Sequence, residues 1–388
     1  MAATIDWPDV IRKGSDGQER AGSPLRDERT AAILGVALGV SFTVCFATGL
    51  YSHWAQSTDP IIAFPARPAG LYRVTQATHV FTGVLSIPLL LAKLWTVLPK
   101  FFRLPPVASL PHLIERASLL PLVGGGLFLL LTGLNNVAAW YPWEFDFVAA
   151  HYWASWITIG GMVAHIGAKI GTTRRVLRRG GGDDPPREDG GLGRRGFFAS
   201  IGALAFFLAA SVESQSIAPF RRLGLFSPRD LSKGPQGFPV NSSAARRGVT
   251  ETAVSPDYRL RVTGAVSSEL SFTVDDLRAM PQHEAELPIA CVEGWSKSAR
   301  WTGIRLRDLL AMAGAGDGAS CTVVSLQARG GFRSSFVNQN HASDPDTLLA
   351  LQINGEELHI DHGFPVRLIG PNRPGVNQTK WVTEVRVS

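Results

Sequence analysis

Four long apolar runs dominate the first half of this chain and limit its fold more than any other feature. They cover residues 30–51, 74–98, 117–140 and 147–171. Each is about 20 residues or longer, which is enough to cross a bilayer as an α-helix. The Gly124-Gly125-Gly126 run within the third favours close helix packing in a membrane. We therefore expect a lipid-embedded helical bundle over residues 30–172.

The second half of the chain has a different composition. From residue 238 to residue 388, short apolar runs alternate with Gly, Pro and charged residues, as in a globular domain. We expect strands at residues 258–264, 271–274, 321–326 and 382–387, helices at 304–312 and 345–351, and a hairpin turn at Asn354-Gly355. The predicted fold class is multidomain, an all-α transmembrane helical bundle followed by an α+β domain.

Charges in the loops indicate how the bundle is oriented. The loop with Lys100, Arg103 and Arg116 is basic, as is the tract that follows residue 171, whereas residues 141–146 contain no Lys or Arg. The positive-inside rule places both basic segments in the cytoplasm and the acidic loop outside. Residues 1–29 are polar and mixed in charge, and we expect them to form a cytoplasmic tail.

Two linkers and one further apolar segment connect the halves. Residues 173–193 are rich in Arg, Gly, Asp and Pro, which is typical of a hydrated linker, and residues 216–237 are a second linker. Between them, residues 194–215 begin with Arg194-Arg195-Gly-Phe-Phe and resemble a twin-arginine export signal. We expect this segment to use the twin-arginine machinery and to remain as a fifth transmembrane helix. The alternative is an ordinary span with orienting arginines.

The chain has three widely spaced cysteines, which give no disulfide framework. Cys45 and Cys321 lie in apolar or β-like runs and are expected to be packing residues. Cys291 lies at the centre of PIACVEGWSKSARWTG, residues 288–303, on a turn that can present its sulfur at a pocket. A lone cysteine is often only a small buried hydrophobe, so this position alone decides nothing.

A second stretch, residues 362–381, gives the cysteine a functional context. It reads HGFPVRLIGPNRPGVNQTKW and places Arg367, Arg373 and Lys380 among Gly and Pro residues. Fixed cations beside exposed backbone amides suit a phosphate-bearing ligand.

Together these two stretches resemble the molybdopterin-binding domain of the sulfite oxidase superfamily, and more closely its bacterial protein-methionine-sulfoxide reductase branch. The segments CVEGW, WTGIRLRDLL and HGFPVRLIGP…KW occur in the family's order and spacing. The resemblance implies a Mo-molybdopterin cofactor whose molybdenum takes its thiolate ligand from Cys291, the catalytic residue. It further implies that these residues bind the cofactor: Asn241, Ser325, His362, Arg367, Gln378, Thr379 and Lys380.

Histidines within the apolar runs suggest a second cofactor, because ionisable residues in membrane helices are rare and usually functional. His151 and His165 are 14 residues apart, which places them on one helix face. His79 begins the second run at about the depth of His151, and two such imidazoles can clamp a haem iron. The alternative is a set of interfacial or helix-contact histidines.

The fourth run and its histidines resemble the four-helix cytochrome b family of formate dehydrogenases and hydrogenases. The resemblance implies one haem b held by His79 and His151. The cytoplasmic end of the first run contains no histidine, so a second haem at His165 is open, with His112 or Lys93 as its neighbour. His53, at the outer end of the first run, could replace His79.

These features lead to one functional prediction. We expect a multi-pass protein of the bacterial inner (plasma) membrane that carries electrons from the quinone pool through haem b to an extracytoplasmic molybdenum centre, which reduces an S-oxide or a similar small substrate. We expect no nucleic-acid partner. The alternatives are a sulfite-type oxidase that feeds electrons into the quinone pool, with Arg300 and Arg333 as anion-binding candidates, and a cytochrome whose outer domain only docks a partner.

Overall fold

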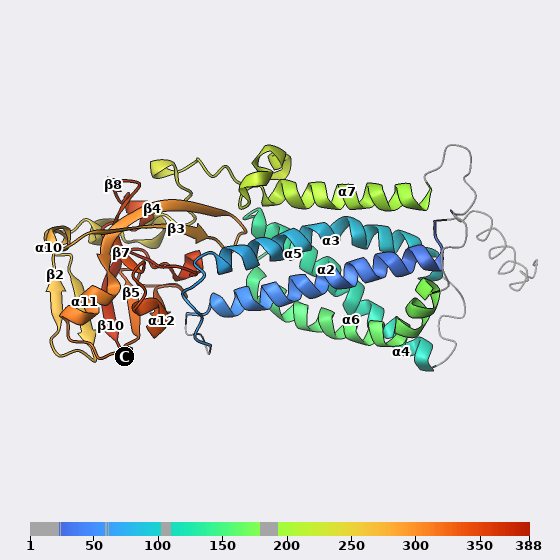
Figure 1. Ribbon diagram of the computed structural model, residues 1–388, viewed down its shortest axis with the longest axis horizontal. Coiled ribbons are helices and arrows are strands. Elements are labelled where there is room, and N and C mark those ends of the chain that lie inside the picture. Colours follow the sequence, from blue (N-terminus) through green and yellow to red (C-terminus); the bar gives the residue numbers. More distant parts are fainter. Residues whose placement is uncertain (1–22, 24, 59, 61, 102–109, 179–192) are drawn as a thin grey trace, which may run out of the picture. The chain divides into compact units, whose positions relative to one another are not determined.

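The structure is a computed structural model that describes residues 23, 25–58, 60, 62–101, 110–178 and 193–388 (Figure 1). The chain divides into two compact units. The first comprises Met1–Val44, Thr82–Leu134 and Glu144–Ala209, and the second comprises Cys45–Phe81, Asn135–Trp143 and Ala210–Ser388. Most of the expected N-terminal tail, residues 1–22 and 24, lies outside the described residues.

Long helices form the N-terminal part of the chain. They are α2 (Glu28–Ala55), α3 (Leu71–Phe101), α4 (Leu110–Leu119), α5 (Gly125–Val137), α6 (Phe147–Arg178) and α7 (Arg194–Glu213), and a π-helical turn, η1 (Leu120–Gly124), joins α4 to α5. Four segments of the described chain are long and apolar enough to cross a membrane: Glu28–Ala55, Leu71–Pro99, Arg116–Val137 and Arg194–Glu213. They match the first three expected spans and the expected fifth helix.

Helix α6 is not among these four segments, although the sequence predicted a span at residues 147–171. Its 32 residues are sufficient in length, but His151, His165 and Lys169, together with Ser, Thr and Gly residues, reduce its mean hydropathy. The helix also continues to Arg178 and takes in the first part of the expected linker. The rest of that linker, residues 179–192, lies outside the described residues.

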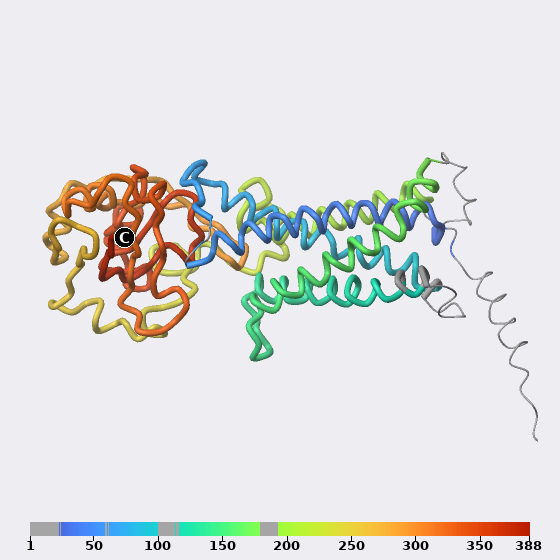
Figure 2. The backbone as a smooth tube through the Cα atoms, turned by 90° about the horizontal axis from the view of Figure 1, so that it is seen from below, coloured from blue at the N-terminus to red at the C-terminus, as the bar shows by residue number. Residues whose placement is uncertain are grey.

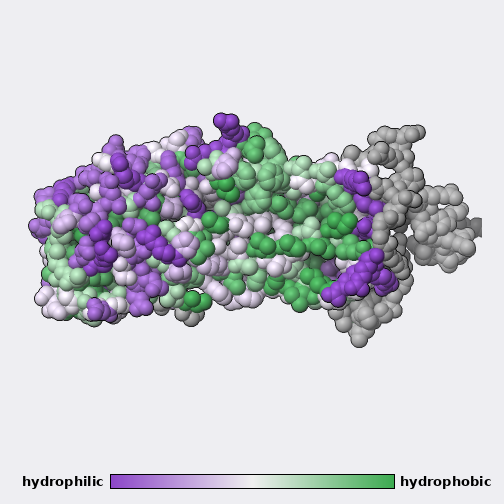
Figure 3. Space-filling view, viewed as in Figure 1, coloured by the Kyte–Doolittle hydropathy of each residue, from purple (hydrophilic) through white to green (hydrophobic). Residues whose placement is uncertain are grey.

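Small residues bring helices of the first unit close together. A Cβ atom on Gly125 would lie 2.2 Å from Thr158 Oγ1, so α5 and α6 can approach at this level only because residue 125 is glycine. The Ser86 hydroxyl donates to Ser41 Oγ over 2.9 Å and joins α3 to α2. Hydrophobic side chains cover much of the helices' visible surface (Figure 3), and they include Val40, Ile157 and Val163.

The expected twin-arginine motif lies at the start of α7. Arg194 forms an ion pair with Asp27, and the Arg194 side chain is only 14% exposed. The function of Arg194 and Arg195 as an export signal stays a prediction.

The second unit contains two five-stranded sheets, whose strands are drawn as arrows in Figure 1. Figure 2 traces the backbone of the same chain from below. The first has the order β2 (Leu270–Phe272), β1 (Leu260–Gly264), β10 (Val382–Val387), β5 (Cys321–Ser325), β6 (Ser334–Val337). The second has the order β3 (His283–Ala290), β4 (Ser296–Arg305), β7 (Leu348–Ile353), β8 (Glu356–Glu357), with β9 (Arg367–Ile369) paired to β7. Strands β1 and β10 are parallel, and the other strand pairs are antiparallel.

Short helices precede and connect these strands. Before β1 lie the 3-10 turns η2 (Ala218–Phe226) and η3 (Pro235–Gly237) and the helices α8 (Ala244–Arg247) and α9 (Thr250–Ala253). Between strands lie α10 (Val274–Ala279), α11 (Leu306–Met312) and α12 (Gln339–Ala342), with the 3-10 turns η4 (Ile360–His362) and η5 (Gly375–Asn377). The α+β class predicted for residues 238–388 is therefore confirmed.

Two hydrophobic clusters form the core of the sheets. One gathers buried side chains such as Leu260, Leu309 and Cys321, which confirms Cys321 as a packing residue. The other includes Cys291 and Trp301, whose indole nitrogen donates to the Leu287 carbonyl over 3.1 Å. The second cluster therefore places Cys291 against the apolar interior of the domain.

The helix predicted at residues 345–351 is wrong, because Leu348–Ile353 forms strand β7. This strand pairs with β4 along one edge and with β8 and β9 along the other. Its two faces pack into the two hydrophobic clusters, so four successive residues from Leu348 are buried. A strand covered on both faces has a continuous apolar run, which periodicity alone cannot distinguish from a buried helix. The hairpin turn that follows is confirmed, because Asn354 and Gly355 have φ values of 53° and 87°.

The central position of β7 predicts a large loss of stability for Leu349→Ala. Leu349 is fully buried, and truncation of a buried leucine costs about 2–5 kcal/mol because it leaves a cavity. Thermal unfolding of the detergent-purified chain measures the effect as a lower midpoint. Gln352→Ala, at the one exposed position of the same strand, is the matched control and should leave the midpoint nearly unchanged. Equal midpoints for the two variants would contradict the assignment of β7 to the core.

Acid should destabilise the C-terminal domain through His341. This side chain is 3% exposed, and burial, followed by the charge of Arg373, lowers its pKa to about 3. Between pH 6.5 and that value the unfolded chain binds a proton that the folded chain does not. The contribution of neutral His341 to the free energy of unfolding is fully present above about pH 6.5. Below that pH it decreases by up to about 1.4 kcal/mol per pH unit.

The measurement is the thermal midpoint at pH 7 and at pH 5. His341→Gln should lose less stability between the two values than the unsubstituted chain. His359→Gln, at a side chain that is 43% exposed, is the control. The same decrease in all three proteins would rule out His341 as the source.

Candidate functional site

Cys291 lies on the turn between β3 and β4. Its backbone N–H donates to the Trp295 carbonyl over 2.8 Å, and the Gly294 N–H donates to the Cys291 carbonyl over 3.1 Å. Gly294 has a φ of +84°, a left-handed conformation that favours glycine. The five residues between the strands therefore form a closed turn with Cys291 at its first position, 5% exposed.

The Cys291 sulfur has polar neighbours despite its burial. Asn241 Nδ2 donates to Sγ over 2.8 Å, and the Glu293 N–H approaches it at 3.5 Å. Burial, followed by the Glu293 carboxylate, raises the pKa of the Cys291 thiol to about 12. A metal cation would displace this proton, because a coordinating thiol binds as the thiolate.

An ion pair lies beside this sulfur. Arg229 pairs with Glu293, and both side chains are largely buried. Sequence reasoning did not identify either residue. Glu293 lies inside the CVEGW segment, but nothing in the sequence indicates that a linker arginine 64 positions earlier contacts it.

A buried arginine and a half-buried lysine form the second part of the site. Arg367 in β9 is 4% exposed, its Nη1 donates to the His362 carbonyl over 3.0 Å, and its Nε has no partner. Burial lowers the pKa of Arg367 to about 9, and burial followed by the charge of Arg367 lowers that of Lys380 to about 7. Among the described residues, no carboxylate forms an ion pair with either cation. Two neighbouring cations that have no carboxylate partner in this interior suit an anionic ligand such as a phosphate.

Gly363 allows these cations to lie close together. A Cβ at this position would lie 3.1 Å from Lys380 Cβ and 3.2 Å from Arg367 Cβ. The φ of Gly363 is +112°, which other residues rarely adopt. His362 precedes this glycine and is 1% exposed, with Nε2 2.7 Å from the Pro235 carbonyl and no partner at Nδ1. Burial lowers the pKa of His362 to about 4.

Lys380 connects several of the predicted cofactor-binding residues. Its Nζ donates to the Ser242 carbonyl over 3.0 Å, next to Asn241, and to the Asp361 carbonyl over 2.6 Å. The Ser325 hydroxyl donates to the Lys380 carbonyl over 2.8 Å. The structure therefore brings Asn241, Ser325 and Lys380 together.

Gln378 and Thr379 are buried and bonded to neighbouring segments. Gln378 Nε2 donates to the Pro288 carbonyl over 3.3 Å, ahead of the Cys291 turn, while its Oε1 has no partner. Thr379 Oγ1 lies 2.7 Å from Ser335 Oγ. Arg373, like the other two cations, donates to neutral oxygens, in its case those of Ser335, Phe336 and Asn377.

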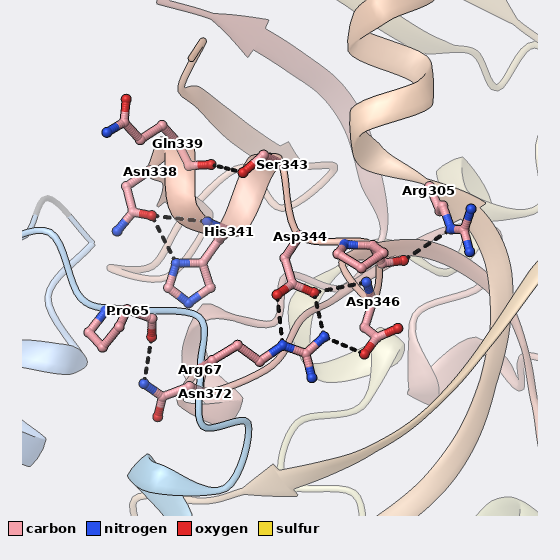
Figure 4. A network of polar contacts seen from close by, with 11 residues as sticks. Pro65, Arg67, Arg305, Asn338, Gln339, His341, Ser343, Asp344, Asp346 and Asn372 are labelled. Atoms are coloured by element: carbon pink, nitrogen blue, oxygen red, sulfur yellow. Dashed lines mark hydrogen bonds and ion pairs between the residues drawn. The ribbon is translucent and has the colours of Figure 1, made fainter. Parts of the chain in front are cut away.

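The segment between α2 and α3, here called the α2–α3 loop (residues 56–70), is bonded to the C-terminal domain within the second unit (Figure 4). Arg67 contacts Asp344 through two hydrogen bonds of 2.9 Å and Asp346 at 2.5 Å. Asn372 Nδ2 donates to the Pro65 carbonyl over 2.7 Å, and Asn338 Nδ2 donates to the Phe64 carbonyl over 3.0 Å. No feature of the sequence predicted this attachment.

The haem-ligand candidates divide between the two units. His79 and His53 belong to the second unit, whereas His151 and His165 belong to the first, so the pairing of His79 with His151 stays a prediction. His79 Nδ1 lies 2.8 Å from the Cys45 carbonyl, and His151 Nδ1 lies 2.9 Å from Thr132 Oγ1. Donation from Nδ1–H favours the tautomer with its lone pair on Nε2, which an iron ligand requires.

Glycine provides space for the ring of His79. A Cβ on Gly49 would lie 2.6 Å from Cε1 of that imidazole, so α2 must carry glycine where the ring packs. His53 lies in the last turn of α2, and His165 lies in α6.

A model of the family described as "Oxidoreductase molybdopterin binding domain" matches residues 247–388. The chain is similar to an Azospira oryzae protein named provisionally as the protein-methionine-sulfoxide reductase subunit YedZ1, with 30% identity over 170 residues that cover 42% of this chain and 63% of the relative. It is similar to mitochondrial sulfite oxidase of Rattus norvegicus, with 33% identity over 162 residues that cover 34% of this chain and 30% of the relative.

A solved structure also matches in part. It is the sulfane dehydrogenase SoxCD from Paracoccus pantotrophus, with 27% identity and a TM-score of 0.32 over 34% of this chain and 38% of that chain. A TM-score this low carries no structural argument. The chain spans less than two thirds of the length of each of these relatives.

The family match covers the Cys291 turn and the Arg367–Lys380 cations, and the buried donors of this region suit a thiolate-bound metal with an anionic partner. Residues 247–388 are therefore a molybdopterin-binding oxidoreductase domain of the sulfite oxidase type, a molybdenum-dependent class of enzyme domain.

Proposed function

We propose that this chain is a membrane-anchored oxidoreductase that passes electrons from quinol through haem b to a molybdenum centre at Cys291, where an S-oxide or a similar small substrate is reduced. The observation that carries the proposal is the Cys291 turn, a buried thiol with an amide donor on its sulfur inside a molybdopterin-binding domain. Reduction of an S-oxide consumes two electrons and two protons and releases water, so the site needs an electron supply.

The residues around Cys291 have complementary roles in holding the cofactor. Cys291 would supply the thiolate ligand of molybdenum, and the family resemblance implies that the pterin dithiolene would supply the other sulfur ligands. Arg367 and Lys380 would bind the phosphate, while Asn241, Ser325, His362, Gln378 and Thr379 would orient the pterin and the thiolate. When bound, the cofactor would supply two-electron redox chemistry and oxygen-atom transfer.

Haem b is proposed from the environment of two histidines. The contacts of His79 with Cys45 and of His151 with Thr132 set the ring tautomer that an axial ligand needs. We propose His79 and His151 as the ligands of one haem. His165 is the candidate for a second haem, and His53 is the alternative to His79.

The membrane location rests on the apolar helices. Four described segments could cross a bilayer, and the loop charges support an extracytoplasmic C-terminal domain at a bacterial inner membrane. Export through the twin-arginine machinery fits a domain that folds around its cofactor before it crosses.

The direction of electron flow is proposed from the relatives. One relative is named as a subunit of a methionine-sulfoxide reductase, which favours reduction, whereas others are named as sulfite oxidases, which makes sulfite oxidation the second candidate. A haem conducts electrons in either direction, so a direct test is required.

Substrate-driven oxidation of the haem should reveal the activity. Reduced, purified protein should be reoxidised by methionine sulfoxide or another S-oxide, and Cys291→Ser should slow this by at least about a thousandfold, equivalent to about 4 kcal/mol, because a serine oxygen is a harder donor than a thiolate. Haem absorbance records the reaction. Cys321→Ala, at the other buried cysteine of the domain, is the matched control and should retain reoxidation.

Two results would contradict this prediction. Full activity of Cys291→Ser would remove the molybdenum assignment. Reduction of the oxidised haem by sulfite, without reoxidation by any S-oxide, would identify the protein as a sulfite-type oxidase.

The haem assignment has its own test. His79→Ala and His151→Ala should each remove the same haem b signal, because each variant removes one axial ligand. The absorbance spectrum of the reduced protein and its haem content provide the measurement. His53→Ala should leave both unchanged. A normal spectrum in His79→Ala together with a loss in His53→Ala would transfer the ligand role to His53.

A further inference from the structure

Two side-chain amides meet at one backbone carbonyl next to Cys291. Asn136 Nδ2, at the end of α5, donates to the Val292 carbonyl oxygen over 2.9 Å. Gln76 Nε2, in the first part of α3, donates to the same oxygen over 3.3 Å. We propose that Gln76 and Asn136 are positioning residues that hold the Cys291 turn against the ends of these helices and make this contact the entry point for electrons. The inference rests on the proposed function.

Gly294, within the same turn, packs closely against side chains of other segments. A Cβ on Gly294 would lie 3.1 Å from Val80 Cγ2 and 3.6 Å from Val137 Cγ2 and from Gln215 Nε2. Ser216 donates its hydroxyl to the Gly294 carbonyl, and the Ser296 N–H donates to the Gln215 carbonyl over 3.3 Å. Segments at the ends of α3, α5 and α7 therefore contact three of the five positions from Val292 to Ser296.

Helix α3 links this contact to the proposed haem ligand. Gln76 and Val80, which both contact the turn, are three residues before and one residue after His79. Electron tunnelling slows steeply with distance and with gaps between atoms, so bonded and packed atoms provide the fastest route. The path runs from His79 along one turn of α3 to Gln76, whose amide donates to the Val292 carbonyl. One peptide unit then joins Val292 to Cys291, so the path contains a single hydrogen bond.

The Gln76 amide is also suited to this role by its burial. Gln76 is 6% exposed, and its Oε1 has no partner, so the side chain is held by its donor bond to Val292. A carbonyl that loses its donors costs free energy, so replacement of both amides should break the contact of Val292 with α3 and α5 while the bonds within the Cys291 turn remain. Loss of one amide leaves the other in place, which predicts a non-additive pair.

The experiment compares Gln76→Leu, Asn136→Leu and the double variant in the purified full chain. Three quantities are measured: the rate of haem reoxidation by methionine sulfoxide, molybdenum and haem content, and methionine sulfoxide reduction driven by reduced benzyl viologen. The double variant should slow haem reoxidation by at least about tenfold, which equals about 1.4 kcal/mol. Dye-driven activity and both cofactor contents should stay within about twofold, less than about 0.4 kcal/mol.

Two further variants separate positioning from general damage. Gln76→Met keeps the length of the side chain but has no hydrogen-bond donor, so in the Asn136→Leu background it should behave like Gln76→Leu. Thr43→Val, at an exposed hydroxyl that bonds only within its own helix, should change nothing. A double variant with the unsubstituted rate of haem reoxidation would overturn the inference, as would equal losses of dye-driven activity or cofactor.

The outcome also distinguishes this inference from the proposed function. If dye-driven reduction works in the unsubstituted protein but its haem is never reoxidised, the proposed electron transfer within the chain does not occur. The inference about Gln76 and Asn136 is then contradicted as well. If the haem is reoxidised and the variants make no difference, only the role of Gln76 and Asn136 is wrong.

Discussion

The burial of the Cys291 thiol is the constraint on which the C-terminal domain depends. A sulfur with 5% exposure and a carboxylate nearby cannot hold a negative charge by itself, and its pKa rises to about 12. The environment of Arg367 and Lys380 disfavours positive charge, because desolvation lowers their pKa values to about 9 and about 7. A ligand that combines a metal cation with an anionic tail relieves both conditions. The protein thus forms two unfavourable charge environments that one molecule can correct.

The sequence was most informative where local pattern and final environment agree. The runs at β1, β5 and β10, the helix α11 and the Asn354-Gly355 turn were predicted because their periodicity or turn chemistry decides the conformation. Strand β7 was missed because its two faces are buried in two hydrophobic clusters whose other members are mostly distant in sequence. Helix α6 shows a related limit. Its pattern predicts a helix, but it does not decide whether that helix crosses a membrane.

Within the site, motif residues could be predicted but their supporting partners could not. Asn241 contacts Cys291, and Lys380 contacts Ser325 and the residue after Asn241, while their role in binding a cofactor stays a prediction. The Arg229–Glu293 pair was missed because only the tertiary fold brings a linker residue to the turn. Gln76 and Asn136 carried a usable signal, since amides in or beside apolar runs need partners. Which partner they select depends on the folded chain.

The α2–α3 loop has a consequence for how the redox groups of this chain would meet. Arg67 binds Asp344 and Asp346, while Asn338 and Asn372 hold the adjoining backbone. When two redox partners diffuse separately, each turnover requires an encounter whose frequency depends on concentration and ionic strength. A covalent connection that is also bonded along its length replaces that encounter with a fixed effective concentration. Dilution then no longer limits the reaction, and the remaining variable is how often the bonded loop opens.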